Sequence, residues 1–280
     1  MIVFLVVVSG ASSLIALLAA WASDTWEREP LESVENVLLL GVAVQVALVL
    51  LARWAAGFDA WGALGLFGVA LPAGILLPFA AAKLSELDEP YDGIVYSVAF
   101  ASGSSLVLLL WDVPALAREA GGAALHPGAV LGLRDLVALL GAPAVLARLG
   151  AHAAAVAVAV LTGGLYGVLV GVRDRRRAPL ALALAGGLLA ALLSLADLLV
   201  QGAWWGRVGL AVLAVIAAFV LKSRSPFRSR PKAPRTDLAV EGVKAALIVI
   251  GACFVALCLL ASVAGSDRFE FPRDGQEWLH

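Results

Sequence analysis

The chain has 280 residues, of which 62% are hydrophobic and only 15% are charged, and its mean hydropathy is +0.96. Soluble domains are about half apolar and about a quarter charged, so one soluble core is excluded and a lipid-embedded protein is expected. The net charge of -1 gives no electrostatic basis for binding nucleic acid. The expected partner of the chain is therefore the lipid bilayer.

Long apolar runs divide the chain into candidate membrane spans. A bilayer core of roughly 30 Å needs about 20 apolar residues per helix, and lipid leaves no alternative partner for the backbone groups. We therefore predict an all-α, polytopic transmembrane helix bundle of about eight spans. The first run begins at Met1 without a preceding basic region, which favours a retained span over a cleaved signal peptide. The predicted spans are residues 2–22, 34–53, 61–82, 93–111, 147–172, 179–200, 205–221 and 240–264.

The chain divides into three predicted parts. Residues 1–221 form the main bundle, which includes the loop 112–146. Leucines recur at helical spacing in this loop, so we interpret it as an amphipathic or re-entrant helix whose apolar face rests on the membrane surface or packs inside the bundle. Residues 222–239 form a basic linker rich in Pro and Ser, and residues 240–280 add one further transmembrane helix with a short polar tail.

Basic residues predict which side of the membrane faces the cytoplasm. Cytoplasmic loops are enriched in Lys and Arg, and eight spans place the runs RDRRR (173–177) and KSRSPFRSRPKAPR (222–235) on one side. We therefore expect loops 173–178 and 222–239 to be cytoplasmic, with Lys83 on the same side and both termini on the other. The expected location is a bacterial-type cytoplasmic membrane. The linker is alternatively a patch for anionic lipid headgroups.

Two passages in the first half of the chain carry a recognisable pattern. SDTWEREPLESVENVLLLG (23–41) has an Asp-x-x-Glu-x-Glu-Pro-Leu spacing, and DEPYDGIVYSVAFASGSS (88–105) has an Asp-Gly-Ile-Val-Tyr helix start. Together they resemble the PrsW family, which consists of glutamic-type intramembrane proteases related to the CAAX prenyl endopeptidases. The resemblance covers the first four predicted spans. The matching positions are Asp24, Glu27, Glu29, Pro30, Asp92, Gly93, Tyr96 and Phe100.

The resemblance also implies catalytic residues that this chain lacks. The family carries a Glu-Glu-x-x-Lys motif at the end of its third span. Anchored on Lys83, that motif places its glutamates where this chain has Phe79 and Ala80. The family's Phe-x-x-x-Glu-Asn motif places Glu and Asn where this chain has Ser104 and Ser105. We infer that these two motifs are degenerate.

Two further family features match only in part. A histidine four residues before an acid in a late span would pair with Asp197, but the chain has Leu193 at that position. A histidine in the fifth span is matched loosely by His152, which precedes LTGGLYG (161–167). The weak catalytic candidates are therefore His152, Asp197 and Lys83. Their structural alternatives are an interfacial or packing histidine, an interhelical hydrogen bond and a snorkelling lysine, respectively.

The substitutions matter because intramembrane peptide hydrolysis needs a general base to activate water. Desolvation raises the pKa of a glutamate toward neutrality and suits it to that task. Phe and Ala cannot take a proton, and a serine acts as a nucleophile only beside a base; nothing in the sequence shows that His152 reaches Ser104. Loss of one general base costs about two to four orders of magnitude in rate. We expect the fold to be kept and the chemistry to be lost.

Three hypotheses follow. The leading one is a non-catalytic PrsW-like protein that acts through helix-helix interactions with single-span membrane proteins or a larger complex. The second is an active intramembrane peptidase that uses acids of the turn 86–92 with His152 or Asp197, although solvation of an interfacial turn already explains those acids. The third is a structural subunit of a larger membrane complex. No cofactor is expected, and three scattered histidines predict no metal site.

The small residues predict close helix contacts. The stretch ASGSS (101–105) presents little side-chain volume, as small-xxx-small patterns do at helix interfaces in membranes.

Overall fold

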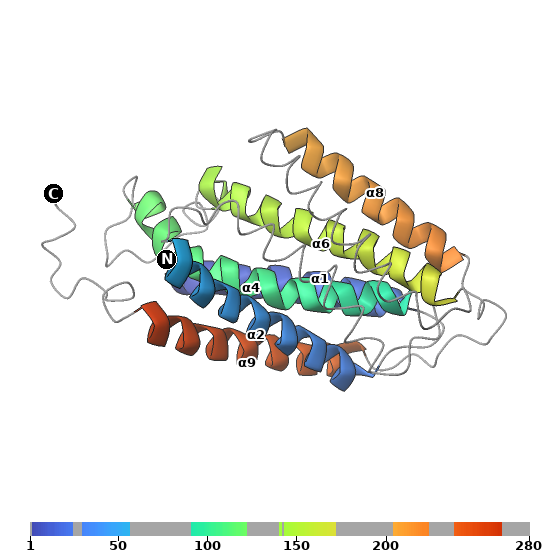
Figure 1. Ribbon diagram of the computed structural model, residues 1–280, viewed down its shortest axis with the longest axis horizontal. Helices are drawn as coiled ribbons and strands as arrows, with labels where there is room; N and C mark the ends of the chain where they lie inside the picture. The colour runs from blue at the N-terminus through green and yellow to red at the C-terminus, as the bar shows by residue number, and fades with distance from the viewer. Residues whose placement is uncertain are drawn as a thin grey trace, which may run out of the picture.

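The described part of the chain is entirely helical. The computed structural model describes residues 2–24, 30–56, 91–121, 140–141, 143–171, 204–223 and 238–264. These residues form helices and no strand, which confirms the predicted all-α class (Figure 1). The helices are α1 (Ile2–Ser23), α2 (Leu31–Ala56), α4 (Asp92–Gly121), α6 (Pro143–Gly171), α8 (Trp204–Ser223) and α9 (Leu238–Ala264).

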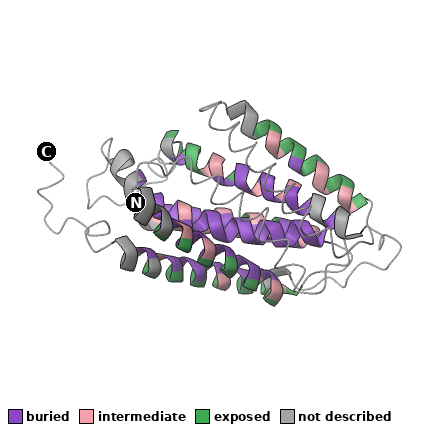
Figure 2. Ribbon diagram, viewed as in Figure 1, coloured by how far each residue is buried: buried purple, intermediate pink, exposed green. Residues whose placement is uncertain are grey.

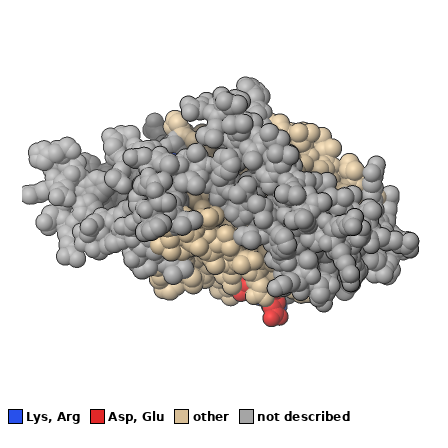
Figure 3. Space-filling view, in the orientation of Figure 1, with Lys and Arg blue, Asp and Glu red and all other residues tan. Residues whose placement is uncertain are grey.

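Four of these helices are long and apolar enough to cross a membrane: α1, α2, α4 and α6. Helices α8 and α9 contain shorter apolar stretches, Val208–Ser223 and Gly242–Cys258. On the face in Figure 3, the described surface is uncharged apart from a small acidic patch, which suits a wall in contact with lipid tails. The protein is therefore an integral membrane protein. The predicted spans 61–82 and 179–200 lie outside the described residues, so the count of eight spans stays a prediction.

The predicted boundaries differ from the observed helix ends. Helix α4 continues to Gly121 and α6 begins at Pro143, so both helices extend into the segment 112–146 that we predicted as a loop. Helix α8 runs to Ser223 and α9 begins at Leu238, so the linker 222–239 is also entered from both sides. Helical hydrogen bonding continues past the apolar run because it depends on the backbone rather than on hydropathy.

Helix α4 forms the centre of the bundle. It packs against α1, α2, α6 and α9, and 94% of its membrane-spanning window is buried inside the protein. Figure 2 shows this as a continuously buried helix among neighbours with exposed outer faces. Helix α8 packs on the outside of α6, and α9 packs against α1 and α2. Helix α4 is thus the core of the fold.

The helices run in two directions (Figure 1). Helices α1, α6 and α8 run one way, and α2, α4 and α9 run the other way. Contacts confirm the antiparallel pair α4–α6, because Gly93 lies against Gly163 while Ser105 lies against His152. Helix α1 therefore begins at the end of the bundle where α9 stops.

Glycines allow α4 to approach its neighbours closely. A Cβ atom on Gly41 or Gly103 would collide with the backbone across the α2–α4 contact. A Cβ atom on Gly93 or Gly163 would do the same between α4 and α6. The predicted close packing at residues 101–105 is confirmed.

Candidate functional site

A hydrogen bond between Ser105 and His152 joins α4 to α6. The Ser105 Oγ lies 2.6 Å from the His152 Nδ1 and also 2.6 Å from the carbonyl oxygen of Ala101. A hydroxyl has one proton, and a carbonyl can only accept it. Ser105 therefore donates to Ala101 and accepts from His152, which assigns the neutral tautomer with the proton on Nδ1.

Both members of this pair are buried. Ser105 is 3% exposed and His152 is 7% exposed. The main chain of Ser12 on α1 approaches the imidazole, whereas Nε2 makes no hydrogen bond to a described residue. The pair therefore lies in the packed interior, where α1, α4 and α6 meet.

Ser104 points to a different helix. Its Oγ donates to the carbonyl oxygen of Gly41 at 3.1 Å, which links α4 to α2. Successive residues on a helix are rotated by about 100°, so Ser104 and Ser105 necessarily face different neighbours. The histidine of the fifth predicted span thus meets Ser105 rather than Ser104. Together the two serines tie the central helix to the helices on either side.

The family-signature residues of α4 are all buried. Gly93 lies against Gly163, and Tyr96 and Phe100 belong to the main hydrophobic core. Asp92 is also buried, at the first position of α4, where the positive end of the helix dipole favours a carboxylate. We expected the carboxylates of the turn 86–92 to be solvated. For Asp92 that is wrong, because the residue begins the most enclosed helix of the bundle.

The first family passage meets α4 at the same end of the bundle. Asp24 is buried directly after α1. Pro30 directly precedes α2, and its carbonyl oxygen accepts hydrogen bonds from the amides of Ser33 and Val34 in the first turn of that helix. The phenol of Tyr91 hydrogen-bonds to Ser23. Burial raises the pKa of Tyr91 above 10.0, the Ser23 hydrogen bond acts the other way, and the charge of Asp24 raises the pKa further.

Several predicted site residues cannot be related to this geometry. The residues of the glutamate motif, the late acid motif and part of the first passage lie outside the described residues, and their predicted roles stay predictions. These residues are Glu27, Glu29, Phe79, Ala80, Lys83, Leu193 and Asp197.

An ion pair that the sequence analysis missed closes the other end of α4 and α6. Arg148 Nε lies 2.9 Å from Asp112 Oδ2, with the arginine half-exposed and the carboxylate largely buried. The signal was available, since Asp112 directly follows the predicted span 93–111 and Arg148 is the second residue of the predicted span 147–172. Opposite charges at the same depth of adjacent antiparallel spans are natural partners.

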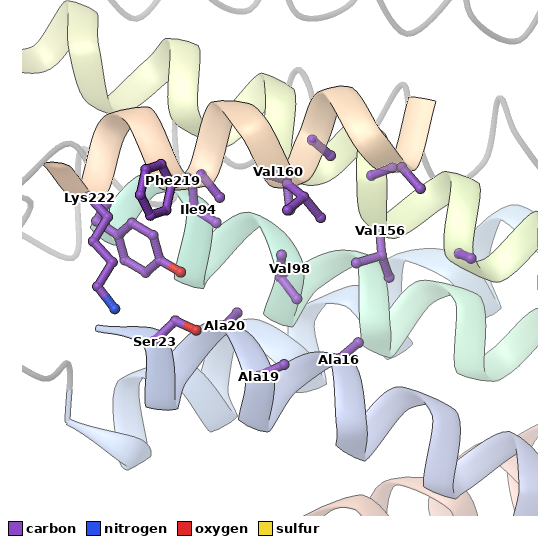
Figure 4. A pocket seen from close by; sticks show the side chains of 17 residues that line it. Ala16, Ala19, Ala20, Ser23, Ile94, Val98, Val156, Val160, Phe219 and Lys222 are labelled. Atoms are coloured by element: carbon purple, nitrogen blue, oxygen red, sulfur yellow. The ribbon is translucent and has the colours of Figure 1, made fainter. Parts of the chain in front are cut away.

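A cavity of about 440 Å³ lies between α1, α4, α6 and α8 (Figure 4). Neither Ser105 nor His152 lines this cavity, although Ala153 and Val156, which lie on α6 with His152, do. No three His, Cys, Asp or Glu side chains in the described ranges gather into a group that could hold a metal ion. The hydrogen-bonded pair and the cavity are therefore separate features.

The Ser105–His152 bond, as assigned above, runs from the imidazole to the hydroxyl. An activated serine donates its proton to a base that is oriented by a third group. Here the serine proton rests on its own helix, and the facing nitrogen is the donor. This arrangement serves as a structural link between helices.

Comparison with protein-family models, with curated proteins and with solved structures finds no match. The resemblance to the PrsW family therefore stays a prediction from the two sequence passages.

Proposed function

We propose that the chain is a PrsW-like integral membrane protein that lacks peptidase chemistry and acts by binding other membrane helices. The hydrogen bond between Ser105 and His152 carries this proposal. At the positions where the resemblance calls for glutamate and asparagine, Ser104 and Ser105 hydrogen-bond to neighbouring helices instead. A hydroxyl committed in this way cannot take a proton from water.

The helix directions support the predicted count of eight spans. Helices α2 and α4 run the same way, and so do α6 and α8 (Figure 1). These directions are compatible with the predicted spans 61–82 and 179–200, which lie outside the described residues and which we propose as one crossing each.

Sidedness follows from the same count. The loops 173–178 and 222–239 then share one side of the membrane, and both termini lie on the other. The basic composition of these loops assigns their side as cytoplasmic, in a membrane of the bacterial type.

The outer face of α9 supplies a surface for a partner helix. Large apolar side chains recur along it at spacings of four, three and four residues, which is the spacing of a knobs-into-holes seam. Gly251 beside this row has open space at its Cβ position, so a partner backbone can approach closely. The exposed residues are Val243 (60%), Leu247 (63%), Ile250 (64%) and Phe254 (69%).

Photocrosslinking in native membranes tests this role. A photoreactive amino acid replaces Ile250 on α9, and the matched control replaces Ile15, an exposed apolar residue on α1. The proposal predicts one discrete crosslinked polypeptide from Ile250 that Leu247→Asn abolishes, and lipid adducts alone from Ile15. Lipid adducts alone from both positions would count against helix binding.

Two alternatives predict different results. An active peptidase with a rearranged acid and histidine set draws support from the Ser105–His152 contact, and it predicts cleavage of single-span membrane substrates that Ser105→Ala abolishes. A structural subunit of a larger complex predicts a partner that co-purifies in fixed stoichiometry in mild detergent. A helix-binding protein outside such a complex predicts exchangeable partners.

A further inference from the structure

The cavity between α1, α4, α6 and α8 has an apolar body and one polar end. Apart from Ser23, Tyr91 and Lys222, every residue that lines it is Ala, Val, Ile or Phe. Its volume of about 440 Å³ falls within the usual range for small-molecule sites, roughly 300–1,000 Å³. The cavity therefore has the size and the walls of a binding site for an apolar molecule.

The three polar residues lie at helix ends on the same side of the bundle. Ser23 is the last residue of α1, Tyr91 directly precedes α4, and Lys222 lies in the last turn of α8. Figure 4 shows the amine of Lys222 at the same end as Ser23, while Val98, Val156 and other apolar side chains extend away from it. This order, polar at the end of the spans and apolar along them, is the order of a bilayer lipid.

The charge at the polar end favours an anion. Lys222 is partly buried there, and no described carboxylate forms an ion pair with it. Ser23 and Tyr91 line the same space, and because the Ser23 hydroxyl donates to the phenol oxygen, the Tyr91 O–H is left to donate a hydrogen bond to a ligand. Asp24 is the nearby opposing charge, since it raises the pKa of Tyr91, but it does not line the cavity.

Other occupants fit the cavity less well. An extended peptide needs partners for its backbone groups, and the apolar walls offer none. An acyl chain needs no hydrogen bonds along its length.

We propose that this cavity binds one acyl chain of an anionic phospholipid, whose phosphate group is held by Lys222 with help from Tyr91, which Ser23 positions. The ammonium group and the phosphate form a charge-assisted hydrogen bond, and burial of the chain against Ala and Val adds the apolar contribution. The site does not depend on the function proposed above, because the Ser105–His152 pair lies outside it.

Native mass spectrometry of the full chain tests this site. The protein is equilibrated in mild detergent with equal amounts of phosphatidylglycerol and phosphatidylcholine that carry the same acyl chains. We expect one phosphatidylglycerol to be retained preferentially. Lys222→Gln should lower its affinity about fivefold, since one lysine near an anionic surface contributes about 1 kcal/mol. Lys222→Arg should keep the preference.

Two further variants separate the cavity from the rest of the surface. Ala211→Phe narrows the apolar part and should remove the retained lipid of either class. Lys244→Gln changes an exposed lysine on α9 that does not line the cavity and should leave the binding unchanged. Circular dichroism confirms the helical content of each variant, and Lys222→Gln decides the question if Ala211→Phe fails to fold. Equal retention of both lipids, or a preference that survives Lys222→Gln, would overturn the proposal.

Discussion

At the scale of single residues, the serines of α4 separate into two kinds. Ser104 and Ser105 make hydrogen bonds to other helices, whereas the hydroxyls of Ser97 and Ser102 are buried without a hydrogen bond to a described residue. A buried polar group that lacks a partner costs free energy, while a bonded one contributes modestly. The four positions therefore provide their own internal controls.

Removal of Ser105 should destabilise the fold measurably. Ser105→Ala leaves the His152 Nδ1–H without its acceptor, and a double-mutant cycle with His152→Ala should give a coupling free energy of about 0.6 to 1.7 kcal/mol. Ser102→Ala, on the same helix and equally buried, should be neutral or slightly stabilising. The measurement is the unfolding free energy in mixed micelles. Equal effects of the two serine variants would show that the bond contributes nothing.

Tyr91 should make stability depend on pH in the alkaline range. Its pKa is raised above 10.0 in the folded protein, chiefly by burial, so the folded state holds the phenol proton longer than the unfolded state. The resulting stabilisation is complete below pH 10.0 and is lost as the pH rises through the raised pKa. Wild type should therefore lose more stability above pH 10.0 than Tyr91→Phe does. Parallel loss in both proteins would contradict the assignment.

The sequence identified Ser104, Ser105 and His152 but not how they pair. The motif spacing defines positions along each helix. The rotation of α6 about its axis and its register against α4 depend on contacts such as Gly93 with Gly163, which no local pattern encodes. The burial of Asp92 was missed for the same reason, since enclosure is a property of the assembled bundle.

At the scale of helices, close backbone approach determines the packing of α4. Without a hydrophobic force between helices in lipid, association relies on dispersion contacts and interhelical hydrogen bonds, and both need short distances. The contact of Gly41 with α4 brings the carbonyl of Gly41 within reach of Ser104.

The effect of a Gly→Ala substitution on stability should therefore depend on whether the glycine lies at a close helix contact. Gly103→Ala inserts a methyl group into the backbone of α2 and should cost about 1 to 3 kcal/mol. Gly251→Ala on α9 meets open space and should gain up to about 1 kcal/mol from helix propensity. Thermal unfolding in detergent measures both. A neutral Gly103→Ala would contradict the packing described for α2 and α4.

The helices themselves were largely predictable. Each described helix coincides with a predicted span, because an apolar run of sufficient length has no other backbone solution in lipid. The residues at which the helices begin and end were less predictable. Helix α2 begins at Leu31, before its apolar run, since Pro30 directly precedes it and its first-turn amides bind the proline carbonyl.

At the scale of the whole molecule, the bundle has α4 at its centre and contains two separate polar features. The Ser105–His152 pair lies in the interior, and the Lys222 end of the cavity lies at the C-terminal end of α8. Composition alone predicted the membrane environment and the helical class. The cavity was not predictable, because its walls come from four helices that are distant in sequence.

Cleavage of single-span membrane substrates by the purified protein in liposomes tests the central claim most directly. Loss of one general base costs about two to four orders of magnitude in rate, so the account predicts no cleavage by the wild-type protein above that of Ser105→Ala and His152→Ala. Cleavage by the wild type that disappears in either variant, or in Asp197→Ala, would contradict the account and establish an active peptidase.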